Sequence, residues 1–357
     1  MFIGNIIDIF MKKWLITLCL TFIVLISMQY VSIKWDKDSI YKADIPETMR
    51  VAHIKNVNGK DFYKNIYVNK QKVDTNLGEH DVLIQVKSAS LTSRDFEFFK
   101  NHQNVKEFVP CSDFSGKVVK VGSAVKDYEI GDPVFGITDL KNAGACADYV
   151  KVPENNINDI PYSLSYKQAA SIPTPALLNW FAVHNIEKKG LKKGKVLIDD
   201  AISETGIMLT GLLVRSGFEV SAIDDERVRS WVENYGVKEF VSYEIFKDKK
   251  KELEGKFDVV INLKNGLHSK DLVALSKQGG TFIAFEDPST TRSDIRMLII
   301  DNKKIDNEIF AKMARLVHLG KIQINVVKEF GLEHIRDAYM LAEKGNNDGK
   351  VVLNINK

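Results

Sequence analysis

The residues with the clearest potential for chemistry lie between Lys195 and Asp225. Ser203 and Gly206 open a helical stretch there, and Asp224 follows 18 positions after Gly206. A glycine in such a turn lets backbone amides approach a phosphate, and a serine hydroxyl can donate to it. An acidic residue at about this spacing binds the 2′-hydroxyl of an adenosine ribose. The pattern predicts a nicotinamide dinucleotide bound by Ser203, Gly206 and Asp224, with Asp224 favouring NADH because it would repel a 2′-phosphate.

The elements that would position these residues form a strand–helix–strand unit. Val196 to Ile198 is a short apolar run, typical of a strand buried in a parallel sheet. Ser203 to Ser216 carries apolar residues at helical spacing, and Phe218 to Ile223 is a second β-rich run. This βαβ order predicts a dinucleotide-binding fold.

The same turn is acidic, which weakens the cofactor prediction. Of the three glycines usual in such a turn, only Gly206 remains, while Asp199, Asp200 and Glu204 are present. Two like charges about 5 Å apart repel by roughly 3 kcal/mol in a partly shielded site. Two alternatives therefore stay open: Ser203 as a helix N-cap, and Asp224 as a solvated carboxylate.

Composition limits the other classes of function. The chain has 357 residues, 45% hydrophobic and 27% charged, which is enough for two packed domains. Its net charge of +3, without a dense basic cluster, gives no indication of nucleic-acid binding. Cys19, Cys111 and Cys146 form no C-x-x-C pair, so no zinc site is predicted. A Cys111–Cys146 disulfide is one alternative, but two reduced, buried thiols are favoured.

The N-terminal segment predicts a membrane anchor. Residues 14–33 carry no formal charge and are long enough to cross a bilayer. A cleaved signal peptide starting at Met11 is the alternative, but no small-x-small cleavage site follows. An uncleaved single-pass anchor is favoured, and the flanking Lys and Arg residues place the globular body in the cytoplasm.

The remaining chain divides into a β-rich part and an α/β part. Short β-rich runs separated by turn residues begin near Met49. Ser165 to Glu187 and Asp306 to Leu319 are predicted helices. Lys350 to Ile355 reads as a strand without a partner nearby in the sequence, so it is expected to return to the β-rich part.

The segment Asp113 to Gly136, DFSGKVVKVGSAVKDYEIGDPVFG, closely resembles zinc-independent medium-chain dehydrogenases/reductases of the quinone oxidoreductase-like and enoyl reductase-like types. The similarity extends in order from about Met49 to Lys357, through Gly144 to Val150 and the closing Gly349 to Leu353. It implies a GroES-like β domain plus a Rossmann-type, doubly wound parallel sheet. It also implies an NADPH-dependent or NADH-dependent reductase without zinc, acting on a small hydrophobic quinone, enone or enoyl thioester, and a possible homodimer.

This resemblance gives the expected domain organisation. The expected divisions are a membrane anchor at 1–34, a linker at 35–48, a GroES-like domain at 49–165, a Rossmann-like domain at 166–320 and a return to the GroES-like domain at 321–357.

Departures from the family pattern gather where the cofactor is expected. Asp200, Ser203 and Glu204 stand at positions that are usually glycine or alanine, and Leu178 replaces a threonine on the helix facing the nicotinamide. Thr92 and Cys146 replace a usual asparagine and tyrosine. The structural glycines are retained, namely Gly116, Gly122, Gly131, Gly136, Gly280 and Gly349.

Two hypotheses follow. One is an oxidoreductase reducing an activated C=C bond or a quinone; the other is a catalytically inactive, membrane-anchored relative that acts as a binding or scaffold protein. The resemblance suggests that Asp95 orders the substrate side of the cleft, with an exposed turn residue as the alternative. Tyr63 and Tyr67 are candidate proton donors by residue type alone, so no catalytic acid is assigned.

Overall fold

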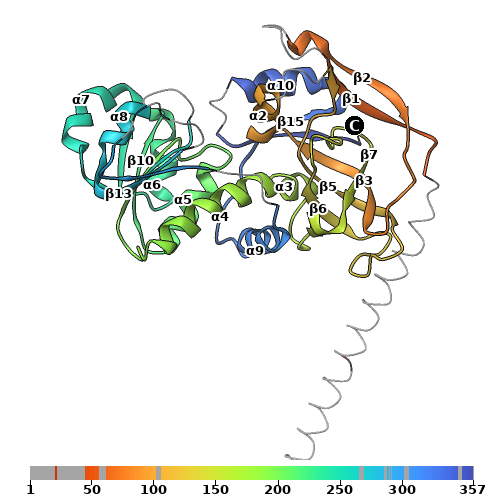
Figure 1. The fold of residues 1–357 in the computed structure, drawn as a ribbon, viewed down its shortest axis with the longest axis horizontal. Helices are drawn as coiled ribbons and strands as arrows, with labels where there is room; N and C mark the ends of the chain where they lie inside the picture. Colours follow the sequence, from red (N-terminus) through yellow and green to blue (C-terminus); the bar gives the residue numbers. More distant parts are fainter. Residues whose placement is uncertain are drawn as a thin grey trace, which may run out of the picture.

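The computed structural model describes residues 45–55, 62–101, 106–264, 269–284, 292–300, 305–344 and 348–356, with Thr21, Pro288 and Thr290 as isolated positions. Figure 1 shows two lobes, one built around a parallel sheet and the other around antiparallel strands, with α4 running between them. The sequence prediction of an α/β fold with a GroES-like part and a Rossmann-type sheet is confirmed.

The first lobe contains a six-stranded sheet in the order β11-β10-β9-β12-β13-β14. Every pairing along this order is parallel. The strand order reverses beside β9, which is where doubly wound sheets bind their ligands. The strands are β9 (Lys195–Asp199), β10 (Glu219–Asp224), β11 (Glu239–Ser242), β12 (Phe257–Asn262), β13 (Ser276–Ala284) and β14 (Arg296–Ile299).

Helices cover both faces of this sheet because its strands are apolar on both. On β9, Val196 and Ile198 pack with Leu209 of α5, whereas Leu197 packs on the opposite face with Phe246 of α7. A strand buried on both faces needs this continuous apolar run. The helices of this lobe are α4 (Pro173–Lys188), α5 (Gly206–Arg215), α6 (Arg229–Asn234), α7 (Tyr243–Leu253) and α8 (Ser269–Ala274), with the short η3 (Glu226–Val228).

The second lobe contains a seven-stranded sheet, with β15-β16-β3-β5-β6-β8 in order and β7 also paired to β3, and a three-stranded sheet in the order β2-β1-β4. Its strands are β1 (Thr48–Lys55), β2 (Ile66–Lys72), β3 (Asp81–Ser90), β4 (Glu107–Phe108), β5 (Asp113–Val121), β6 (Pro133–Ile137), β7 (Tyr149–Pro153), β8 (Ile157–Asp159), β15 (Val326–Gly331) and β16 (Lys350–Asn354).

Helical segments complete this lobe and its connection to the parallel sheet. They are η1 (Phe62–Asn65), α2 (Ser93–Asn101), η2 (Glu154–Asn156), α3 (Tyr166–Ala169), α9 (Asn307–His318), η4 (Leu332–His334) and α10 (Ile335–Glu343).

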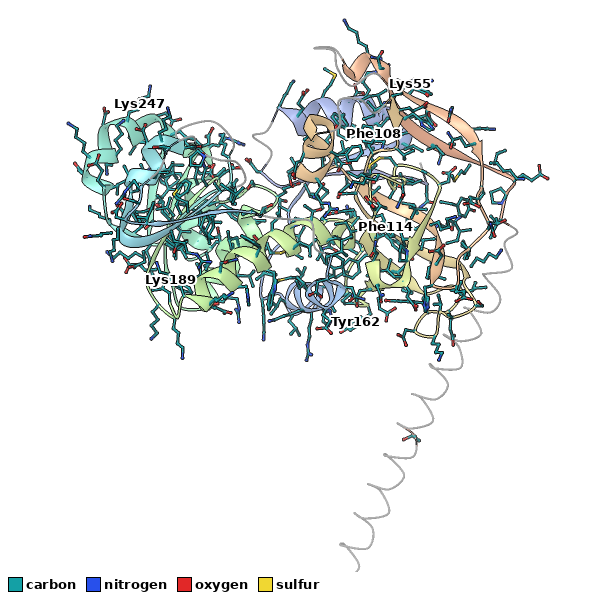
Figure 2. The ribbon with its side chains drawn as sticks, in the orientation of Figure 1. Lys55, Phe108, Phe114, Tyr162, Lys189 and Lys247 are labelled. Carbon is teal, nitrogen blue, oxygen red and sulfur yellow. A yellow bond between two sulfur atoms is a disulfide. The ribbon has the colours of Figure 1, made fainter. Side chains whose placement is uncertain are left out.

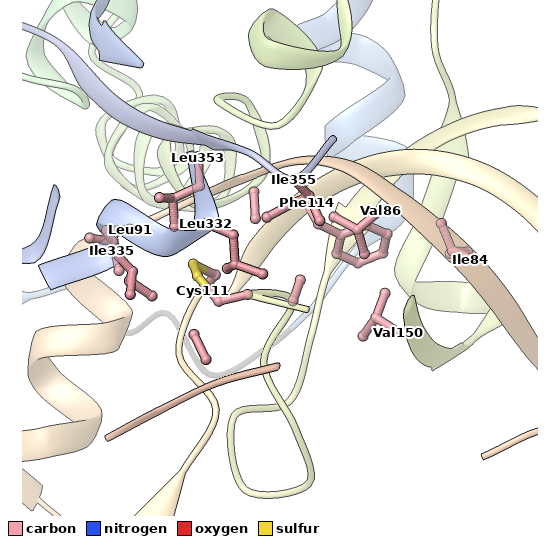
Figure 3. Packing of buried hydrophobic residues seen from close by; sticks show 14 of the residues in the cluster. Ile84, Val86, Leu91, Cys111, Phe114, Val150, Leu332, Ile335, Leu353 and Ile355 are labelled. Carbon is pink, nitrogen blue, oxygen red and sulfur yellow. A yellow bond between two sulfur atoms is a disulfide. The ribbon is translucent and has the colours of Figure 1, made fainter. Parts of the chain in front are cut away.

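The core of the second lobe joins residues that are distant in the sequence. Figure 3 shows Phe114 of β5 packed beside Val86 of β3 and Ile355 near the C-terminus. β16 pairs antiparallel with β3, with Val352 opposite Ser90. The C-terminal strand therefore lies inside this sheet, and Lys350 enters the lobe's interior. Figure 2 shows the contrast between Phe114 inside the lobe and Tyr162 at the surface.

Two predicted helices differ from the observed ones. The stretch expected to run from Ser165 to Glu187 is divided into α3 and α4, because Pro173 cannot continue a preceding helix but suits a first helical position. The helix expected from Ser203 begins at Gly206 instead, because Ser203 belongs to the turn before it.

The N-terminal prediction requires a correction. Residues 14–33, apart from Thr21, lie outside the described residues. Within the described part of the chain, no helix has both the length and the apolar character needed to cross a membrane. The predicted single-pass membrane location with a cytoplasmic body therefore has no support and is withdrawn.

Candidate cofactor and substrate site at the domain junction

The turn between β9 and α5 keeps the backbone path of a dinucleotide-binding turn. Asp200 has a left-handed φ of 68°, a conformation that glycine adopts most readily. A Cβ at Gly206 would lie 2.2 Å from the Asp200 carbonyl oxygen, so only glycine fits there. Ser203 Oγ donates to that carbonyl oxygen at 2.9 Å and accepts from the Gly206 amide at 3.2 Å. Ser203 therefore caps the turn, and its contact with a phosphate stays a prediction.

Asp224 reaches the same turn from the end of β10. One carboxylate oxygen accepts from the Ile202 amide at 3.3 Å and the other from the Asp225 amide at 2.8 Å. The residue is 4% exposed, and burial raises the pKa of its carboxyl group. The structure thus brings Ser203, Gly206 and Asp224 to one turn, although Asp224 supports the turn itself. Its contact with a ribose stays a prediction.

The neighbouring carboxylates do not all converge on one point. Asp199 is buried and accepts a hydrogen bond from the Tyr243 hydroxyl at 3.0 Å. Burial and the nearby Asp200 raise the pKa of Asp199 well above its usual range. The Lys264 ammonium lies 4.3 Å from the centre of the Tyr243 ring and lowers the pKa values of these carboxyls. The carboxylates of this turn would therefore repel a bound diphosphate less strongly than the sequence suggests.

Asp200→Asn is expected to stabilise the protein at neutral pH. Burial, followed by the Asp224 charge, raises the pKa of Asp200 to about 6. A raised carboxyl pKa means that the folded state holds the proton more tightly than the unfolded state. The contribution of this group to the free energy of unfolding is therefore fully present below about pH 4 and is lost as pH rises through about 6. Because the side chain is partly exposed, we expect a gain of about 1–2 kcal/mol at pH 7.

Urea unfolding of wild type and Asp200→Asn at a series of pH values measures this effect. The gain should shrink as pH falls from 7 to 4. Asp248→Asn, an exposed carboxylate on α7, is the matched control and should give no such pH-dependent difference. A gain that is constant over this range would contradict the assigned cause.

Glu204 crosses from the turn to the GroES-like lobe. Its carboxylate lies 3.0 Å from the Lys350 ammonium of β16 and accepts a 3.4 Å hydrogen bond from the Ser93 amide at the start of α2. The Lys350 side chain is 1% exposed and also lies 3.7 Å from Asp113. The sequence did not single out Lys350; its only signal was a lysine in an otherwise apolar strand.

Asp113 joins the two lobes from the other side of Lys350. It accepts hydrogen bonds from the Thr174 amide at 2.9 Å and the Thr174 hydroxyl at 2.6 Å, at the N-terminus of α4. Helix N-termini stabilise negative charge, as does the Lys350 ammonium. Burial raises the pKa of Asp113, and both Lys350 and Thr174 oppose that rise.

Asp95 is buried rather than exposed, which excludes the turn-residue alternative. Its carboxylate accepts from the Thr92 amide at 2.9 Å, the Thr92 hydroxyl at 3.0 Å, the Cys111 amide at 2.6 Å and the Ser112 amide at 3.4 Å. Burial raises its pKa to about 6, against the effect of these bonds. Asp95 therefore organises the loop before β5, and Thr92 is committed to the same network.

Cys111 and Cys146 form a disulfide, so the prediction of two reduced thiols is wrong. Their Cα atoms lie 5.2 Å apart, within the range that a disulfide spans, and both residues are buried. Figure 3 shows Cys111 near Leu91 and Ile335. Among the described residues no group of three or more His, Cys, Asp or Glu could hold a metal ion. The residues present do not fit a zinc site, and independence from zinc stays a prediction.

The other residues singled out from the sequence lie elsewhere. Leu178 is buried in α4 within the apolar core of the parallel-sheet lobe. Tyr67 lies on β2, where its hydroxyl donates to Glu107, and Tyr63 lies in η1. The structure therefore gives Tyr67 no place beside the turn.

Known protein families and solved structures show the same architecture. Residues 78–162 match the family model described as Alcohol dehydrogenase GroES-like domain, and residues 235–353 match Zinc-binding dehydrogenase. The quinone oxidoreductase from Coxiella burnetii superposes with a TM-score of 0.77 at 23% identity, covering 86% of this chain and 99% of that one. The chain therefore belongs to the medium-chain dehydrogenase/reductase superfamily.

Similar curated proteins include oxidoreductases named for NAD(P)H or NADPH and a furanone reductase. The mitochondrial NAD(P)H oxidoreductase RTN4IP1 of Dictyostelium discoideum is 26% identical over 76% of this chain and 90% of its own length. The 2-methylene-furan-3-one reductase of Solanum lycopersicum is 28% identical over 77% of this chain and 72% of its own length. The NADPH-dependent alkenal/one oxidoreductase of Arabidopsis thaliana is 27% identical over 87% of this chain and 81% of its own length.

Proposed function

We propose that the protein is an NAD(P)H-dependent oxidoreductase of the quinone/enoyl reductase type, acting on a small hydrophobic electrophile with an activated C=C bond or a quinone ring. The observation that carries the proposal is the 3.0 Å contact between Glu204 and Lys350, which brings the turn between β9 and α5 against the GroES-like lobe. Hydride transfer depends on such juxtaposition of a cofactor and an electrophile. The relatives' reductase activities and the solved quinone oxidoreductase support it.

The turn fits a nicotinamide dinucleotide. Its backbone path is retained at Asp200 and Gly206, and the buried Lys350 ammonium lies beside it. The bound cofactor supplies the hydride. The chain supplies the turn amides and the Ser203 hydroxyl for the phosphates, and Asp224 for the adenosine ribose. A homodimer is part of the proposal by family resemblance.

The test measures the oxidation of NADH and of NADPH by the full chain, with a quinone, an α,β-unsaturated ketone and an alkenal as the electron acceptors. We expect turnover with NADH preferred, because the Asp224 carboxylate repels a 2′-phosphate. Asp224→Asn removes that charge but keeps an acceptor, so NADPH should improve relative to NADH by about tenfold in kcat/KM. A contaminating reductase would not respond to this substitution.

Failure of the proposal has a definite signature. Nucleotide binding can be followed by the fluorescence of Trp180 and Trp231. The proposal would be contradicted if a cooperatively folded protein bound neither NADH nor NADPH at millimolar concentration. That result would instead favour the catalytically inactive alternative. Nucleotide binding without a preference that depends on Asp224 would leave the function standing and contradict only the role of Asp224.

A further inference from the structure

Lys350 is an unusual buried cation. Its side chain is 1% exposed, and its ammonium lies 3.0 Å from Glu204 and 3.7 Å from Asp113. Yet among the described residues it has no hydrogen bond of acceptable geometry to either carboxylate. A buried ammonium offers three donors, and leaving them unsatisfied is costly. The ammonium therefore retains donors for an acceptor other than the Glu204 carboxylate.

A second unsatisfied group belongs to a residue that contacts the same carboxylate. Ser93 donates its backbone amide to Glu204 at 3.4 Å, while its buried hydroxyl has no partner in the described part of the chain. Ser93 is the first residue of α2, whose N-terminus carries a partial positive charge. Lys350 and Ser93 thus place an ammonium and an amide against one anion, Glu204, and the same serine carries a buried hydroxyl that has no partner among the described residues.

Of the charged groups here, Glu204 is the one that can leave. The Asp113 and Lys350 side chains are 0% and 1% exposed, whereas the Glu204 side chain is 22% exposed. Turning Glu204 into solvent gives up its contact with Lys350 but hydrates its carboxylate, while Lys350 and Asp113 remain as a buried pair. Because Glu204 belongs to the turn before α5, a phosphate bound at that turn would lie within reach of Lys350.

We propose that Lys350 and Ser93 form an anion-binding position at the domain junction, that Glu204 occupies it in the free protein, and that a phosphate group of the nicotinamide dinucleotide takes it when Glu204 turns away. This inference rests on the proposed function. Glu204 acts as an internal competitor, because binding requires the conformation in which it has left. The apparent affinity is reduced by the fraction of molecules in that open conformation.

The experiment is direct titration of NADH and NADPH into the full chain, comparing wild type with Glu204→Gln. The neutral amide binds Lys350 more weakly, so both nucleotides should bind about tenfold more tightly to the variant. Glu219→Gln is the matched control, because it removes the same charge from an exposed position on β10 that lies outside the junction. It should leave both affinities unchanged.

A second variant tests the anion-binding position formed by Lys350 and Ser93. Ser93→Ala in the Glu204→Gln background should return part of the gain, about threefold, because one donor to the phosphate is lost. Inorganic phosphate should compete with the nucleotide in Glu204→Gln, and it should compete about threefold less well when Ser93 is also replaced by alanine. Competition that ignores Ser93 would overturn the assigned position.

The outcomes separate this inference from the function. Equal or weaker binding in Glu204→Gln, while wild type still binds and turns over nucleotide, overturns the inference and leaves the function standing. An equal gain in Glu219→Gln also overturns it, because the effect would then be general charge. Absence of nucleotide binding in every folded variant overturns both.

Discussion

Asp113→Ala is expected to lower the free energy of unfolding by about 3–5 kcal/mol, because it leaves the Lys350 ammonium buried beside a single, partly exposed carboxylate. The same substitution removes the acceptor for the Thr174 amide and hydroxyl at the N-terminus of α4. Asp113 also joins β5 of one lobe to a helix of the other, so the loss should weaken their connection. Urea unfolding followed by circular dichroism and by tryptophan fluorescence measures both effects.

The control is an ion pair of the same kind in a different environment. Lys195 and Glu219 lie 3.4 Å apart, but their side chains are 51% and 53% exposed. Glu219→Gln should therefore change the free energy of unfolding by less than about 1 kcal/mol. If Asp113→Ala were as mild as this control, burial would not be the source of its importance.

A double-mutant cycle isolates the interaction between Asp113 and Lys350. Lys350→Met alone should also destabilise strongly, whereas the double variant should lose less than the sum because neither charge is left alone. We expect a coupling energy of about 1–3 kcal/mol. Additive effects would mean that the two residues act independently, contrary to their placement in the structure.

The parallel-sheet lobe was predictable because its signals are local. The apolar run Val196 to Ile198 became β9, and the next β-rich run became β10. Both strands are buried on two faces, which requires that continuous apolar pattern. The switch in strand order beside β9 then follows from the family's topology. Ser203, Gly206 and Asp224 also lie together, because strand ends and the following turn meet at one edge of a parallel sheet.

The direction of the acidic side chains was not predictable from spacing. The sequence predicts that Asp199, Asp200 and Glu204 direct their charges toward one bound diphosphate. In the structure Asp199 is bonded to Tyr243, and Glu204 is paired with Lys350. Both partners come from other elements, so no local pattern could show them. Lys350 in particular enters the site only because β16 pairs with β3.

The Cys111–Cys146 disulfide is only the less favoured alternative in the sequence for a related reason. Cys111 precedes β5, and Cys146 precedes β7, with a sequence separation of 35. Two scattered cysteines carry no framework signal, whereas their proximity depends on the Cys146 segment lying beside both β1 and the Cys111 loop. The Ala52 amide donates to the Cys146 carbonyl at 2.9 Å, and the Ala145 amide donates to the Cys111 carbonyl at 2.7 Å. These contacts are tertiary, and they place the two residues side by side.

Reducing the Cys111–Cys146 disulfide is expected to lower the free energy of unfolding by about 3–4 kcal/mol, as the loop-entropy relation gives for a separation of 35 residues. The cross-link limits the unfolded chain more than the folded one, since backbone hydrogen bonds already hold the two segments together. Unfolding with and without a reductant measures the difference. The double variant Cys111→Ser, Cys146→Ser should match the reduced wild type and no longer respond to reductant.

Thiol counting under denaturing conditions checks the cross-link itself. The chain contains three cysteines, so the oxidised protein should expose one reactive thiol, from Cys19, and the reduced protein three. Cys19→Ser should remove that single thiol while leaving the response to reductant intact. Three reactive thiols before reduction would show that the bridge is not formed.

Because the Cys111 amide donates to Asp95 at 2.6 Å, the loop that Asp95 organises should also become more mobile on reduction. Faster amide exchange confined to that loop and the Cys146 segment would connect the cross-link to the Asp95 network.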